Sequence, residues 1–135
     1  PNAIFRNGDS IMAFADYEIV KESQDEYSVY KDNIFMTSCG TCRIALSYCI
    51  LDKNKMLNDA KNLVVLEDKI LGRQNEMMHY RHVASSSKVD EFRREVVLHR
   101  LTSAKAEYQM LQKQLTKSIN VAKYCQQKGF ENEII

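Results

Sequence analysis

The 135-residue chain is long enough for one modest hydrophobic core and too short for two independent enzymatic domains. It has four cysteines, a net charge of +1 and no apolar run that approaches about 18 residues. These features argue against a disulfide scaffold and a transmembrane helix, and they favour a reducing, intracellular setting. The charge is uneven, because residues 1–60 carry 6 Lys/Arg against 9 Asp/Glu, whereas residues 88–128 carry 9 against 4.

The first part of the chain predicts a small antiparallel sheet. Residues 11–20 are rich in aromatic and β-branched side chains and follow the turn signal Gly8-Asp9, so they predict a strand. Residues 27–30 and 33–36 predict one or two further strands joined by a turn. An antiparallel meander is the expected result.

A C-x-x-C motif, Cys39 and Cys42, follows this sheet. Such a pair has three chemical meanings: half of a tetrahedral zinc site, a dithiol redox centre, or two buried small residues. A structural zinc ion would need further ligands. They could come from Cys49, from the pair His79 and His82, from another chain or from residues before Pro1. Redox catalysis is disfavoured, because the motif lacks a surrounding βαβ pattern and the chain has no internal proline. Other familiar catalytic motifs are absent too, so we predict that the protein is not an enzyme.

The segments after the motif carry weaker patterns. Residues 43–51 are apolar in an alternation that fits a strand, and a short helix fits them as well. Residues 57–62 have turn chemistry, and the apolar run at 63–66 predicts a short buried strand. Residues 74–83 are polar and predict a connector with a helical turn or two.

The last part of the chain predicts one long helix. Ser87 and Asp90 fit a capping box, so the helix is expected to begin at Lys88. Gly129 is placed to close it, with Phe130 available to pack back on the last turn. Such a helix would be about 60 Å long. Its basic side chains are interpreted as a solvated face, with contact to nucleic acid or to an acidic partner as the alternative.

Apolar or small residues recur along this helix at alternating spacings of four and three, which is a heptad seam. The seam consists of Val97, Leu101, Ala104, Tyr108, Leu111, Leu115, Ser118, Ala122 and Cys125. The preceding part of the chain is too small to cover a helix of this length, so the seam predicts association with helices of other chains. The predicted interface of this homo-oligomer or hetero-oligomer is Val97, Leu101, Ala104, Tyr108, Leu111, Leu115 and Ala122. The number of chains in the oligomer stays open.

Several short segments occur in an order that is typical of one known family. They are Gly8-Asp9-Ser10, Cys39-Gly40-Thr41-Cys42, the segment LNDAKNL at 57–63 and the segment EDKILG at 67–72. Together with the final helix they make the chain similar to the Mis-eighteen family of centromere-licensing proteins, in which a Yippee-like β domain precedes a C-terminal coiled coil. Residues 1–7 contain no counterpart of the family's first C-x-x-C, so half of the expected zinc site is missing.

The resemblance and the residue patterns together predict an α+β fold. The expected parts are a Yippee-like β domain at 1–72, a connector at 73–87, a coiled-coil helix at 88–129 and a tail at 130–135. By resemblance, Cys39 and Cys42 would ligate zinc.

The function that the resemblance implies is that of a non-enzymatic oligomeric adaptor in the nucleus, at the centromere. Such adaptors help to recruit the chaperone that deposits the centromeric histone variant CENP-A, and they work with a paralogue and with a Myb/SANT-domain protein. The alternative is an unrelated interaction module, also a β domain with a coiled coil, in which the cysteines are structural.

Overall fold

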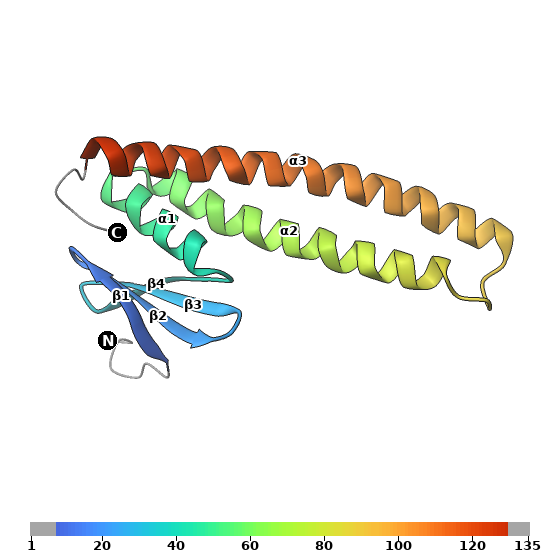
Figure 1. Ribbon diagram of the computed structural model, residues 1–135, viewed down its shortest axis with the longest axis horizontal. Coiled ribbons are helices and arrows are strands. Elements are labelled where there is room, and N and C mark those ends of the chain that lie inside the picture. The colour runs from blue at the N-terminus through green and yellow to red at the C-terminus, as the bar shows by residue number, and fades with distance from the viewer. Residues whose placement is uncertain (1–7, 130–135) are drawn as a thin grey trace.

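The computed structural model describes residues 8–129 as four strands followed by three helices (Figure 1). The strands are β1 (Asp9–Phe14), β2 (Tyr17–Ser23), β3 (Glu26–Lys31) and β4 (Ile34–Cys39), and the helices are α1 (Cys42–Lys53), α2 (Leu57–Ala84) and α3 (Glu91–Gly129). The predicted α+β class is confirmed.

The strands form one antiparallel meander in the order β1-β2-β3-β4, as the sequence predicts. Asp32 and Asn33 form the tight turn between β3 and β4, and both have positive φ, as a hairpin turn of type I′ requires. The prediction of a single strand over 11–20 is wrong, because the chain turns at Ala15 and pairs β1 with β2. Ala15 has a φ of 49°, a value for which the sequence gives no signal because glycine or asparagine is the usual residue there.

Helix α1 lies between the sheet and the two long helices (Figure 1). Thr41 caps its first turn, where the Thr41 Oγ1 atom accepts a hydrogen bond of 3.3 Å from the Ile44 amide. Its side chains are buried on almost every side, from Ile44 to Leu51. Residues 43–51 are therefore helical rather than extended. The alternation is misleading because a helix that is covered on both faces shows no polar stripe.

A Schellman motif ends α1. The Lys55 amide donates to the Asp52 carbonyl and the Met56 amide donates to the Leu51 carbonyl, each at 2.9 Å. Lys55 takes the left-handed position of this motif with a φ of 63°. A side chain at that φ is strained, and glycine is the residue that fits.

Lys55→Gly is therefore expected to raise the free energy of unfolding by about 1 kcal/mol, as measured by urea denaturation. The same change at Lys61, exposed inside α2, serves as the control and should lower it by about 1 kcal/mol. If both variants lose stability, the left-handed conformation at residue 55 is contradicted.

Helix α2 corrects three predictions. Residues 57–62 are not a turn, residues 63–66 are not a strand and residues 74–83 are not a connector, because all three segments belong to this continuous helix. Its buried residues are Ala60, Leu63, Leu66, Ile70 and Met77, which lie along one helical stripe. The run of four apolar residues at 63–66 hides this stripe in the sequence. Beyond Ile70 only Met77 is fully buried, so the apolar period of a helix is weak there.

Helix α3 begins at Glu91 rather than at Lys88. The Asp90 carboxylate caps it by accepting a hydrogen bond of 2.8 Å from the Arg93 amide, so Asp90 takes the role predicted for Ser87. The Arg94 guanidinium donates to three carbonyls of the preceding segment, which holds the connection between α2 and α3 in place. The expected packing of Phe130 and the tail at 130–135 lie outside the described residues.

The hydrophobic core joins the sheet, α1 and the adjoining halves of α2 and α3. The remaining halves, residues 71–84 of α2 and residues 91–108 of α3, extend away from the sheet as a two-helix arm (Figure 1). We call this part the distal arm. Within residues 8–129, no helix is both long and apolar enough to cross a membrane.

Candidate functional site

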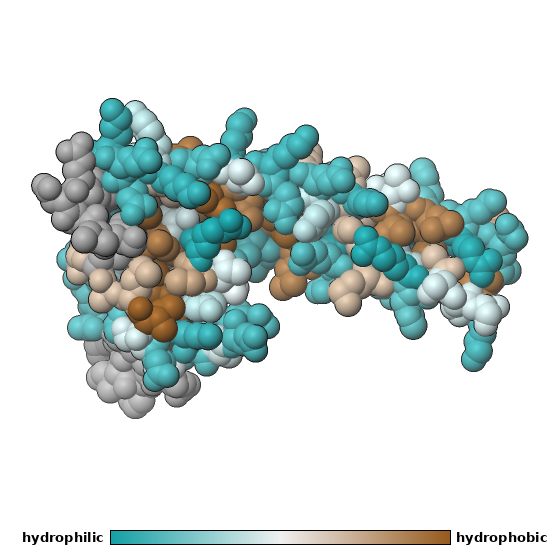
Figure 2. Space-filling view, in the orientation of Figure 1, coloured by the Kyte–Doolittle hydropathy of each residue, from teal (hydrophilic) through white to brown (hydrophobic). Residues whose placement is uncertain are grey.

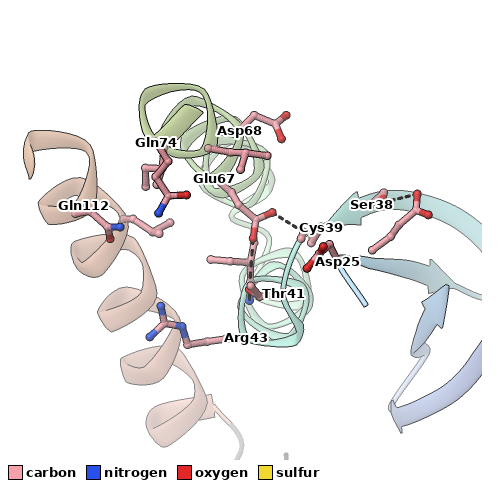
Figure 3. Close-up of a pocket in the computed structure, with 15 residues that line it drawn as sticks. Asp25, Ser38, Cys39, Thr41, Arg43, Glu67, Asp68, Gln74 and Gln112 are labelled. Carbon is pink, nitrogen blue, oxygen red and sulfur yellow. Dashed lines mark hydrogen bonds between the residues drawn. The ribbon is translucent and has the colours of Figure 1, made fainter. Parts of the chain in front are cut away.

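The C-x-x-C turn connects the end of β4 with the start of α1. Cys39 is buried, with 3% of its surface exposed, and Cys42 is the half-buried first residue of α1. Glu67 of α2 points at this turn (Figure 3). Its carboxylate accepts a hydrogen bond of 2.6 Å from the Gly40 amide and one of 3.4 Å from the Thr41 hydroxyl. A side chain of this protein thus occupies the anion position at the start of α1.

The environment of the two buried thiols opposes ionisation. Burial raises the pKa of the Cys39 thiol to about 12, and the carboxylates of Glu67 and Asp68 add to this effect. Burial likewise raises the pKa of Cys49 to about 12, with a further contribution from Cys39. Because the thiolate is both the nucleophile and the metal ligand, these two residues are suited to structural packing.

The zinc site predicted from the motif cannot be completed from the described residues. Among residues 8–129, no group of three or more His, Cys, Asp or Glu side chains is placed to hold a metal ion. His79 and His82 are exposed on the distal arm, whereas Cys49 is buried inside α1. The donor set therefore does not fit a tetrahedral site. Zinc ligation by Cys39 and Cys42 with ligands from elsewhere stays a prediction.

A cleft of about 660 Å³ opens beside the turn, between the sheet and the long helices (Figure 3). Four acidic residues, Asp25, Glu26, Glu67 and Asp68, line it together with one basic residue, Arg43. The side chains of Gln74 and Gln112 approach it from α2 and α3. The Tyr108 hydroxyl accepts hydrogen bonds from both amides, at 3.3 Å and 3.0 Å, which ties the two helices together on this side.

The seam of α3 faces the protein's own helices. Its members Val97, Ala104, Leu111, Leu115 and Ala122 are buried, and Leu101 and Tyr108 are half-buried. Helices α2 and α1 pack against α3 and cover it. The expectation that only helices of other chains could cover the seam is therefore wrong, because the segment predicted as a connector supplies part of the second helix.

One residue of the seam is not among the predicted ones. Ile119 is buried with 5% exposure, whereas Ser118 is only partly covered. Both positions fit between Leu115 and Ala122 at spacings of three and four, so the larger apolar side chain was the available signal.

The exposed apolar side chains of the long helices were missed as well. They are Leu57, Val65, Leu71 and Met78 on α2 and Phe92, Leu98, Met110, Val121 and Tyr124 on α3. In the space-filling view, apolar side chains lie between polar ones along the arm (Figure 2). One signal was visible in the sequence, because Leu57, Leu71 and Met78 are separated by multiples of seven residues.

The chain was compared with protein-family models, with curated proteins and with solved structures. None of the three comparisons finds a match.

Proposed function

We propose that this protein is a non-enzymatic adaptor in which the sheet and α1 hold a helical arm that binds other polypeptides. The observation that carries the proposal is the exposure of large apolar side chains on the arm: Leu71 is 55% exposed, Met78 66% and Phe92 77%. An arm that only contacted water would carry polar residues at these positions. Exposed apolar surface on a helix is a feature of many protein–protein contacts.

A more specific proposal is that the adaptor acts in centromere licensing. It is supported by the order of the sequence segments and by a sheet that precedes long helices. The Yippee-like identity of the sheet, the nuclear location at the centromere, and the paralogue, Myb/SANT-domain and CENP-A chaperone partners all belong to this proposal. The assembly surface that it requires would be the exposed side of the arm, since the seam is covered.

The alternative is an adaptor outside this family, with structural cysteines. The packing of Cys39 and Cys49 favours it, because both thiols are buried and have a raised pKa. The two proposals share the arm as the binding element and differ in the cellular process.

Both can be tested in cells of the source organism with a tagged chain. Centromere licensing predicts a signal at centromeres and less newly deposited CENP-A after depletion, restored by the wild-type chain. The double variant Met78→Lys and Phe92→Lys should not restore deposition. The control Gln114→Lys, at an exposed polar position, should restore it.

Unchanged CENP-A deposition after depletion would contradict the licensing role. The adaptor role is tested separately, by the mass of the native complex in lysate. The wild-type chain should run well above the mass of two chains, and the double variant should run near the mass of one. A wild-type chain that runs at the mass of one or two chains would reject the adaptor proposal.

A further inference from the structure

One side of the distal arm lacks the cover that the rest of the hairpin has. Helix α1 packs against both α2 and α3, but it begins at Cys42, beside Glu67. Beyond that point no described element follows α1 along this side of the arm (Figure 1). The groove between α2 and α3 thus continues past the helix that fills its first part.

This uncovered side carries exposed apolar side chains on both helices, among polar ones. Leu71 lies at the base of the arm, where it lines the cleft. Met78 follows one heptad later and lies on the same side of α2. Leu98 lies two heptads before Gln112, which lines the same cleft from α3, so it shares this side of the arm and is 45% exposed. We call the surface of Leu71, Met78 and Leu98 the open face.

The charges at the two ends of the open face are opposite. Its base adjoins the cleft with Asp25, Glu26, Glu67 and Asp68 against one arginine. Residues 77–94, which form the tip of the arm, carry 4 Lys/Arg against 2 Asp/Glu. Two such arms laid antiparallel would place each basic tip against the acidic base of the other, whereas a parallel arrangement would bring like charges together.

We infer that the open face is occupied by a second copy of this chain. The inference rests on the proposed adaptor function and specifies its first partner. The two arms pack antiparallel about a two-fold axis near Met78, so that the contact is isologous and closes at two copies. In this arrangement Asp68, at the base of one arm, lies toward the tip of the other arm, which carries Arg81 and Lys88.

The size of the open face limits the strength of the contact. Residues 71–84 extend about 20 Å at 1.5 Å per residue, and two helices side by side are about 20 Å wide. The covered surface is then roughly 400 Å² per copy, about half of what a stable interface buries on each partner. The dimer is therefore expected to be weak, to form with rising concentration and to dissociate with added salt.

The first test is sedimentation velocity on the full chain from about 1 μM to about 200 μM, a range that covers dissociation constants in the micromolar region. The mass should rise from one chain toward two. Met78→Asp should weaken dimerisation at least tenfold, because it puts two facing carboxylates at the axis. Met110→Asp is the matched control on another side of α3, where the side chain is 51% exposed, and it should dimerise like the wild type.

The second test exchanges the charges. A base variant with Asp25→Lys and Asp68→Lys and a tip variant with Arg81→Glu and Lys88→Glu should each be monomeric, because each then carries like charges at both ends. An equimolar mixture should form dimers of one copy of each, because every base again meets a tip of opposite charge. Circular dichroism checks that all variants are folded.

Three outcomes would overturn the inference: a wild-type chain that stays monomeric up to about 200 μM, equal losses for Met78→Asp and Met110→Asp, or a mixture that stays monomeric. None of them rejects the adaptor function, which fails if the complex in lysate has no more than the mass of two copies of this chain. The two proposals can therefore fail independently.

Discussion

Leu111→Ala is expected to lower the free energy of unfolding by about 3 kcal/mol, because it opens a cavity in the core. Leu111 is 5% exposed and lies in the core cluster with side chains of α1 and α2. Since those neighbours belong to the same chain, the loss should be independent of protein concentration. Urea denaturation at two concentrations about twentyfold apart measures both quantities.

Met110→Ala is the control for this prediction, because Met110 is the neighbouring residue and its side chain is half exposed. It should change the free energy of unfolding by less than about 0.5 kcal/mol. The prediction would be contradicted by a Leu111→Ala variant that unfolds like the wild type but no longer forms an oligomer that the wild type forms. Such a result would mean that the seam contacts other chains.

The second large effect is a loss of stability at alkaline pH. Burial raises the pKa of both Cys39 and Cys49 from 9.0 to about 12. Burial and the hydrogen bond of 2.5 Å to Asp52 also raise the pKa of the Tyr17 hydroxyl well above its usual value. The fold thus prefers the neutral form of each group, so its contribution is complete below pH 9 and is lost as the pH rises toward 12.

Thermal melts followed by circular dichroism should therefore show a transition temperature that falls steadily above about pH 9. Cys49→Ala removes one of the groups and should flatten this decline, although the cavity lowers stability at neutral pH. Cys125→Ala, at a half-buried position near the end of α3, is the control and should keep the wild-type slope. Equal slopes in all three proteins would contradict the assignment.

The sequence predicted the sheet well, because its strands carry aromatic and β-branched residues with polar turns between them. It failed where the structure departs from those signals. Ala15 turns the chain with a positive φ that alanine rarely adopts. The sequence therefore predicts one strand where the structure has β1 and β2. Residues 74–83 bury little beyond Met77, because a two-helix arm has only one covered stripe, and so they lacked the apolar period of a helix.

The candidate site was predictable only in part. The position of the C-x-x-C motif and most of the seam follow from spacing along the chain. The contact of Glu67 with Gly40 joins residues that are 27 positions apart, and no local pattern indicates it. The error about the seam has the same origin, because the helix that covers it was not recognised.

The return of α3 to the start of α2 has a consequence for the order of folding. Every strand pairs with its neighbour in the chain, whereas the Cys125 Sγ atom lies 3.8 Å from the Met56 Sδ atom across 69 residues. Contacts between distant residues carry the larger loop-closure entropy, so the meander is expected to form early and the end of α3 to dock late. Amide hydrogen exchange should accordingly be slowest in the central strands and α1 and faster toward the C-terminal turns of α3. Detachment of those turns would expose Ile119 and Ala122 while the sheet stays folded, so partial opening, rather than complete unfolding, sets the chain's exposure to proteases.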